Sequence, residues 1–173
     1  MKAIELIQND IPPVRINESI EKALNWMDEF KLNHIPVVNE KEYVGLLSDN
    51  MIYDHNQLKD PISNINLLGN QQSVLENAHF FQVMTLISTY NLSVVPVCDD
   101  QRNYIGSIST KKLINVFSKQ SGFNSPGAII TLLVNKIDYQ LSQIAQIIES
   151  NDAKILSPVS YTHLTLPTTW LVG

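Results

Sequence analysis

The segment that decides the fold is "HIPVVNEKEYVGLLS", residues 34–48, and the chain repeats its pattern as "VVPVCDDQRNYIGSIS", residues 94–109. Each copy has an apolar run with a proline, a polar turn, and a second run that contains glycine and ends in serine. Two apolar runs joined by a short turn predict a pair of antiparallel strands. Because proline removes a ladder hydrogen bond, we expect Pro36 and Pro96 at the start or the edge of their strands.

The repeat extends upstream, since residues 17–38 lie over residues 77–98 at a constant offset of 60 residues. Apolar residues in the first copy recur with the i, i+3, i+4, i+7 spacing of an amphipathic helix, at Ile20, Ala23, Leu24 and Met27. A second helix begins at Ser48 in one copy and at Ser109 in the other. With a leading strand around Val14 or Val74, each copy is predicted to be a β-α-β-β-α unit.

Composition limits the class of protein. The chain has 173 residues, 44% of them apolar, and a net charge of −5. The length and apolar content are enough for a core in one or two domains. The charge does not indicate nucleic-acid binding. The single cysteine, Cys98, cannot form an internal disulfide, and no Cys/His cluster has zinc spacing. No apolar run could span a membrane, and Glu5 and Asp10 interrupt the N-terminus where a signal peptide needs an apolar core. We therefore expect a soluble, cytoplasmic protein.

The paired units resemble a tandem of CBS domains, often called a Bateman module, over about residues 1 to 120. We assign residues 1–58 to the first unit and 59–120 to the second, with a linker at 55–73 that is mostly loop and has a short extended piece near 62–67. The resemblance implies an α+β fold in which the two units pack about a pseudo-two-fold axis. It also implies that clefts between the units bind adenine nucleotides or related ligands, and that the pair acts as a sensor.

Residues 121–157 are similar to the start of an ACT domain, a ferredoxin-like βαββαβ unit of which only a βα(β) part is expected here. A strand at 128–134 leads into a helix with apolar residues on one face, followed by a strand that begins near Lys154. That helix face holds Leu141, Ile144, Ala145 and Ile148. A CBS pair followed by such a segment resembles the acetoin-utilisation type of bacterial CBS protein.

The tail at 158–173 breaks the pattern, because prolines and threonines replace any helical or strand period. The string "VSYTHLTLPT" also resembles translated sequencing-adapter read-through. We therefore expect a non-native tail and a truncated ACT-like segment, and we assign no function to His163 or Trp170.

The resemblance to CBS domains also implies a set of ligand-contacting residues. Backbone groups around each proline would read an adenine edge, and the serine that ends each second strand would offer its hydroxyl to a phosphate at a helix N-terminus. Plain N-capping is the alternative role of both serines, and the two readings stay open. The expected set is Val14, His34, Ile35, Pro36, Ser48, Val74, Val94, Val95, Pro96, Ser109 and Lys112.

The sequence departs from the family pattern at the residue that would bind ribose. An Asp is expected three residues after each serine, but Met51 and Lys112 stand there, and neither accepts a useful hydrogen bond. Asp49 is no simple substitute, because two positions on a helix turn the side chain by about 200°. Lys111 and Lys112 oppose the dipole of their helix, so a bound anion nearby would offset this unfavourable interaction. The alternative, which we favour, is an exposed pair that points into water.

Two functions follow from these features. The first is a regulatory module that binds AMP, ATP, S-adenosylmethionine or another anionic small molecule, and we expect it to form a homodimer. The second is a ligand-free dimerisation or scaffold module. No enzyme is expected, because His34, His55 and His79 are scattered and Cys98 matches the core residue Val38.

Overall fold

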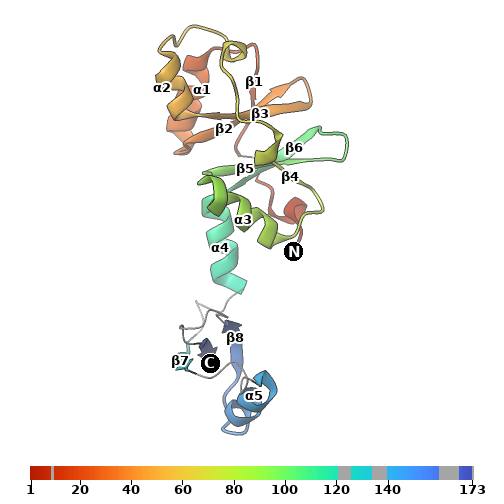
Figure 1. Cartoon of the computed structure of the whole chain (residues 1–173), viewed down its shortest axis with the longest axis vertical. Helices are drawn as coiled ribbons and strands as arrows, with labels where there is room; N and C mark the ends of the chain where they lie inside the picture. Colours follow the sequence, from red (N-terminus) through yellow and green to blue (C-terminus); the bar gives the residue numbers. More distant parts are fainter. Residues whose placement is uncertain (9, 121–125, 134–139, 160–167, 173) are drawn as a thin grey trace. The chain divides into compact units, whose positions relative to one another are not determined.

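The computed structural model describes residues 1–8, 10–120, 126–133, 140–159 and 168–172. The chain divides into two compact units, Met1–Leu113 and Ile114–Gly173, and each is described by itself. Figure 1 shows the two repeats within the first unit.

Each repeat has the predicted order of strand, helix, two strands and helix, and the fold is mixed α+β. The elements of the first repeat are β1 (Val14–Arg15), α1 (Ile20–Phe30), β2 (His34–Asn39), β3 (Glu42–Ser48) and α2 (Asp49–His55). The elements of the second repeat are β4 (Val74–Leu75), α3 (Phe80–Tyr90), β5 (Val94–Cys98), β6 (Tyr104–Ser109) and α4 (Thr110–Gln120). Both sheets have the central strand parallel to the first and antiparallel to the third, in the orders β1-β2-β3 and β4-β5-β6.

The prolines differ from the prediction, because each is the third residue of the central strand of its sheet. Pro36 lies opposite Leu46 on β3, but Leu46 directs its N–H to Leu68, on the side away from β2. On the other side β1 pairs only with Val37 and Val38. The missing N–H of Pro36 therefore costs no ladder bond, and β2 is left without a neighbour along its first three residues on the β1 side.

Two segments outside the repeats cover them, one on each repeat. The 3₁₀ turn at Ala3–Leu6 lies on the second repeat, where Ala3 and Ile4 donate to the carbonyls of Ala78 and Glu76. The 3₁₀ turn at Ile62–Asn64, where the sequence predicted an extended piece, lies on the first repeat, and Ile62 donates to Glu18. The first repeat is thus covered by the segment that follows it, and the second repeat by the segment that precedes the first.

The repeated glycine has a steric cause. A Cβ on Gly45 would lie 2.6 Å from the Leu68 carbonyl oxygen, and one on Gly106 would collide with the Ile7 side chain. Leu68 bridges to Leu46, and Gln8 bridges to Ser107, the corresponding residue of the second repeat. Glycine is needed because these covering segments run directly over β3 and β6.

The core of the first repeat lies between its sheet and the helices α1 and α2, which lie side by side in Figure 1. Its fully buried members include Ile20, Ala23, Met27, Ile35 and Leu47. The predicted stripe of α1 therefore faces the core, with Leu24 packed against it as a partly buried residue.

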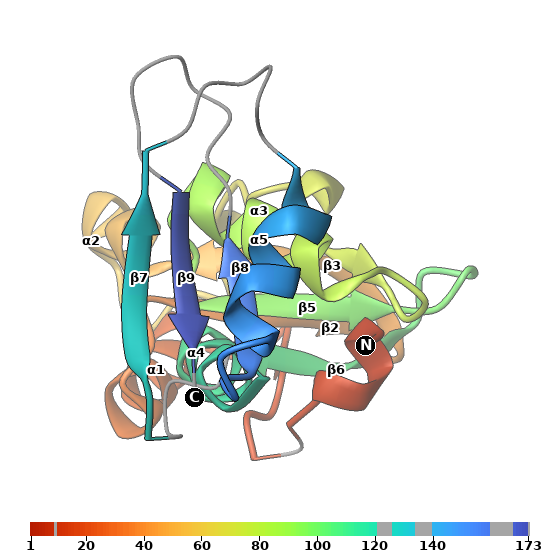
Figure 2. The ribbon, with the colours of Figure 1, turned by 90° about the horizontal axis from the view of Figure 1, so that it is seen from below.

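The second unit contains β7 (Ala128–Leu132), α5 (Leu141–Glu149), β8 (Ile155–Val159) and β9 (Thr168–Val172). The strands form an antiparallel sheet in the order β7-β9-β8, seen side by side with α5 in Figure 2. The predicted strands and helix are present, but β9 is an addition, because the sequence showed no strand period after residue 157. Part of residues 158–173 is therefore paired in a sheet; their origin stays a prediction, and His163 lies outside the described residues.

Candidate functional site

The two repeats meet where β2 and β5 begin. His34 lies opposite Ser48 in the β2–β3 register, and Val94 lies opposite Ser109 in the β5–β6 register. The strands β2 and β5 are themselves in contact. Four of the predicted site residues are therefore brought together as two facing pairs at one junction.

Ser93 joins the two repeats at this junction. The hydroxyl oxygen of Ser93 accepts from the backbone N–H groups of Asn33 and His34, each at 3.0 Å. The N–H of Ser93 donates to Nδ1 of His34 at 3.3 Å. The entrance of β2 is thus fixed to the residue that precedes β5.

His34 is held in its neutral form. Burial lowers the pKa of His34, although the carboxylate of Asp49 acts in the opposite direction. Because Nδ1 accepts the Ser93 N–H, the ring proton belongs on Nε2. His34 therefore lies at the junction as a half-buried ring whose neutral form is favoured and whose Nε2 is the donor.

The two predicted serines are both N-caps. The Ser48 oxygen accepts from the N–H of Met51 at 3.4 Å, and the Ser109 oxygen accepts from the N–H of Lys112 at 3.1 Å. Ser109 also donates its hydroxyl proton to the side-chain carbonyl of Gln8 at 2.6 Å. The capping role is confirmed, and a ligand at the second junction would have to share or replace Gln8.

The apolar residues of the predicted site have mostly buried side chains, so they offer backbone groups rather than side chains to the junction. The side chains of Val14, Ile35, Val94 and Val95 are fully buried, both prolines are buried, and Val74 is half-buried. Val14 and Val74 pair with Val37 and Val97, further along the strands. Val14 and Val74 therefore lie beside the junction, outside the two facing pairs.

Met51 and Lys112 stand where the family pattern has an aspartate that binds ribose. Met51 packs against the core, and its side chain offers no acceptor. Asp49 accepts from the side-chain amide of Asn33 at 2.9 Å, so its carboxylate already has a partner. Lys112 is half-exposed on the first turn of α4.

Sequence reasoning missed Gln8 and Ser93. Ser93 could have been found, because Asn33 and Ser93 occupy the same polar position before each central strand. Gln8 carries no such signal, since 101 residues separate it from Ser109.

Other groups named from the sequence have structural roles. Cys98 is buried as predicted, and burial raises the pKa of its thiol to about 11. His79 caps α3, and His55 contacts Asp60, lowering the pKa of that carboxyl through a hydrogen bond. Across the described ranges, no three His, Cys, Asp or Glu side chains are grouped so as to hold a metal ion. None of the described helices has the length and hydrophobicity to cross a membrane.

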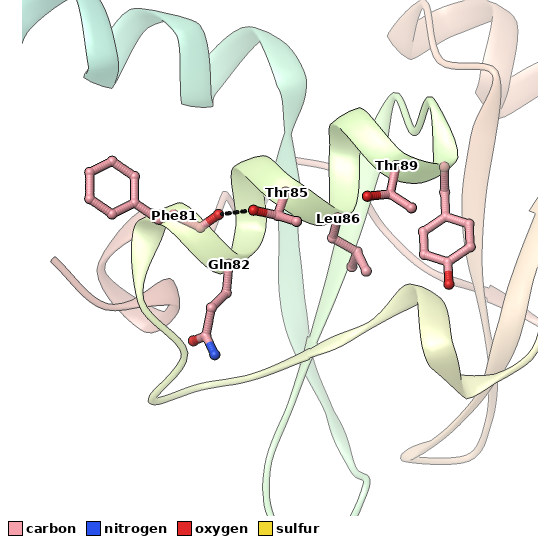
Figure 3. A pocket seen from close by; sticks show the side chains of 6 residues that line it. Phe81, Gln82, Thr85, Leu86 and Thr89 are labelled. Carbon is pink, nitrogen blue, oxygen red and sulfur yellow. Dashed lines mark hydrogen bonds between the residues drawn. The ribbon is translucent and has the colours of Figure 1, made fainter. Parts of the chain in front are cut away.

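Two surface hollows lie away from the junction. One is a groove on α3, shown in Figure 3, lined by Phe81, Gln82, Thr85, Leu86, Thr89 and Tyr90. The other lies at the far end of β2, beside the β2–β3 turn.

Comparison with known families identifies the fold. The chain belongs to the CBS domain family, whose model matches residues 3–55 and 63–119. The two matched stretches correspond to the two repeats described above.

Solved structures of CBS pairs share this fold. A CBS domain pair/ACT domain protein from Thermotoga maritima is 19% identical, with a TM-score of 0.62 over 69% of this chain and 98% of that chain. CBSX2 in complex with AMP is 17% identical, with a TM-score of 0.57 over 68% and 96%. The CBS domain pair of protein MJ0100, in complex with 5′-methylthioadenosine and S-adenosyl-L-methionine, is 24% identical, with a TM-score of 0.54 over 69% and 97%.

Proposed function

We propose that this protein is a regulatory module whose CBS pair binds an adenine nucleotide or a related adenosine compound at the junction of the two repeats. The observation that carries the proposal is the facing of His34 with Ser48 and of Val94 with Ser109 where β2 and β5 meet. Relatives of the same fold are solved with AMP and with S-adenosyl-L-methionine, which supports AMP, ATP or S-adenosylmethionine as the ligand.

The second junction has the parts that an anionic group requires. The second junction lies at the positive end of the α4 dipole, and Lys112 adds a cation within the first turn of that helix. Ser109 can turn its hydroxyl from Gln8 toward a phosphate oxygen. Ribose would be held differently from the family pattern, because Met51 and Lys112 lack an acceptor.

Calorimetric and thermal-shift titrations of the full chain with AMP, ATP and S-adenosylmethionine test the proposal. A ligand that binds the folded state must raise the unfolding midpoint. Ser109→Ala and Lys112→Glu should weaken binding about tenfold each, through loss of a charge-assisted contact. Ser63→Ala, at an exposed serine outside the junction, is the matched control. Unchanged affinity in both junction variants would exclude the second junction.

A ligand-free scaffold is the second candidate function, and α3 favours it. All eleven residues of α3 are uncharged, and Phe81 is 62% exposed beside the groove of Figure 3. A two-fold contact sets equal residues against each other, which an uncharged helix tolerates. We propose a homodimer through this face. Phe81→Glu should yield a monomer in analytical ultracentrifugation, whereas Tyr53→Glu on α2 should not.

The remaining assignments are proposals of the same kind. We propose that residues 121–157 are a partial ACT-like segment that transmits the ligand signal, supported by its β-α-β order and by the Thermotoga CBS/ACT relative. The boundaries 1–58 and 59–120, the cytoplasmic location and the non-native origin of 158–173 stay predictions. Sequencing the 3′ end of the gene tests the last of these.

A further inference from the structure

A polar pocket lies at the end of β2 opposite to the junction. It has a volume of about 530 Å³ and is lined by Arg15, Ile16, Asn17, Val38, Asn39, Glu40 and Lys41. Since β2 runs from His34 to Asn39, the strand itself separates this pocket from the serines of the junction. The pocket is therefore a different site from the proposed adenosine site.

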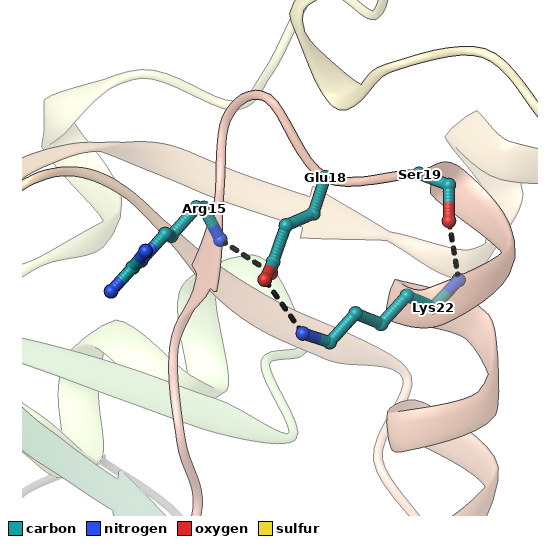
Figure 4. A network of polar contacts seen from close by, with 4 residues as sticks. All are labelled: Arg15, Glu18, Ser19 and Lys22. Atoms are coloured by element: carbon teal, nitrogen blue, oxygen red, sulfur yellow. Dashed lines mark hydrogen bonds and ion pairs between the residues drawn. The ribbon is translucent and has the colours of Figure 1, made fainter.

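The guanidinium of Arg15 is available to bind a ligand in this pocket. The backbone N–H of Arg15 donates to Glu18 at 2.9 Å, and Lys22 donates to the same carboxylate at 2.6 Å. Burial alone would raise the pKa of Glu18, but these hydrogen bonds lower it, so the carboxylate stays ionised. Figure 4 shows the Arg15 side chain pointing away from this pair. Glu18 thus has its ion pair with Lys22, and the Arg15 guanidinium acts on that carboxylate only through its charge, without an ion pair among the described residues.

The opposite wall of the pocket is a turn held in place by the second repeat. The carbonyl of Lys41 accepts from the N–H of Tyr104 at 2.8 Å, and the N–H of Tyr43 donates to Arg102 at 3.0 Å. Within the described parts of the chain, no carboxylate lies within ion-pair distance of Arg15 or Lys41. Two cations therefore line one pocket, one on β1 and one on a fixed turn, and neither has an ion-pair partner there.

The second repeat supplies an internal comparison. Leu75 stands in place of Arg15. The turn of the second repeat has one residue more, and the residue that corresponds to Lys41 is Arg102, since the N–H of Tyr104 donates to Lys41 as the N–H of Tyr43 donates to Arg102. At the position of Asn39, Asp99 closes its own turn by accepting from the N–H groups of Gln101 and Asn103. The pair of cations is thus a property of the first repeat, because the second repeat has a cation on its turn and Leu75 in the place of Arg15.

We propose that this pocket is an anion site that takes a small molecule bearing one phosphate or carboxylate group. Arg15 provides a planar pair of donors suited to two oxygens of that group, and Lys41 adds a second positive charge. The amides of Asn17 and Asn39 are further donors on the same wall. The carboxylate of Glu40 faces the same space, which disfavours a polyphosphate and restricts the site to a single anionic group.

A nuclear magnetic resonance titration of the full chain with inorganic phosphate tests the proposal, with sodium chloride holding the ionic strength constant. The backbone amides of 15–17 and 39–41 should shift and saturate. Arg15→Leu, which introduces the residue of the second repeat, and Lys41→Gln, which removes the charge on the turn, should each weaken binding about tenfold. Glu40→Gln should strengthen phosphate binding. Lys59→Gln, at an exposed lysine outside the pocket, should leave phosphate binding unchanged.

A parallel titration with acetate separates the two ligand classes. Saturation by phosphate alone assigns the site to phosphate compounds, and saturation by acetate assigns it to carboxylates. Absence of saturation by either probe, or equal shifts in the Arg15→Leu/Lys41→Gln double variant, overturns the proposal. Adenosine, which carries no anionic group, should leave these amides unshifted even if it binds at the junction.

Discussion

The side-chain carbonyl of Gln8 accepts a 2.6 Å hydrogen bond from Ser109, 101 residues further along the chain. In the first repeat Leu68 occupies the position that Gln8 has in the second, because Leu68 bridges to Leu46 as Gln8 bridges to Ser107. Ser48 is therefore only an N-cap, whereas Ser109 is an N-cap and a tie to the N-terminal segment. Two serines with the same place in the sequence pattern have different surroundings in the structure.

This difference predicts unequal costs of removing the two hydroxyls. Ser109→Ala should lower the free energy of unfolding by about 2 kcal/mol, since it removes a cap and a second hydrogen bond. Ser48→Ala should cost about 1 kcal/mol or less, since it removes a cap alone. Urea denaturation of both variants measures the difference, and equal losses would show that Gln8 contributes nothing.

The two glycines under the covering segments should tolerate a methyl group unequally. Gly45→Ala should cost about 2–3 kcal/mol, because its Cβ meets the backbone oxygen of Leu68, which cannot move alone. Gly106→Ala should cost about 1 kcal/mol, because the Ile7 side chain can rotate away. Gly69→Ala is the control, with no atom within 4 Å of the added carbon and a φ of −75°. Thermal unfolding ranks the three variants, and the reverse order would contradict the assigned contacts.

Tyr43, which is buried, and Tyr104, which is half-buried, should respond oppositely to loss of the hydroxyl. The Tyr43 hydroxyl is buried without a hydrogen-bond partner, and burial raises its pKa far above the ordinary value. Tyr43→Phe should therefore stabilise the protein by about 1 kcal/mol. Tyr104, whose hydroxyl lies 2.9 Å from Ser107 and whose pKa burial raises to about 12, should lose about 1 kcal/mol on substitution by Phe. Denaturation midpoints compare the pair, and destabilisation by Tyr43→Phe would contradict the missing partner.

His34 should make stability depend on pH below neutrality. Its pKa is lower in the folded chain than the ordinary value of 6.5, so as the pH falls through 6.5 the unfolded chain takes up a proton first. Stability contributed by the neutral ring is present above pH 6.5 and is lost as the pH falls toward the folded pKa. His34→Val, which introduces the residue of the second repeat, should flatten this dependence between about pH 5 and 7. An unchanged slope in unfolding titrations would assign the effect to other groups.

Much of the fold could be predicted because each local sequence pattern occurs twice in the chain. The stripe of Ile20, Ala23 and Met27 predicted both the helix and its buried face, and the paired apolar runs predicted both hairpins. The placement of Pro36 was wrong, because sequence alone does not show how far β1 extends along β2. The strand β9 was missed, because Thr168 to Val172 follows a run without strand period, and its place between β7 and β8 exists only in the folded sheet.

The sequence by itself determined the two β-α-β-β-α repeats, the N-cap positions of Ser48 and Ser109, and the absence of an aspartate three residues after each serine. These features depend on neighbours within a few residues, where periodicity and capping act. Only the tertiary structure decided that the N-terminal segment covers the second repeat, that Gln8 reaches Ser109, and that Arg15 and Lys41 line one pocket. Those relationships depend on which distant segments the packed sheets bring together, and no local pattern encodes such distances.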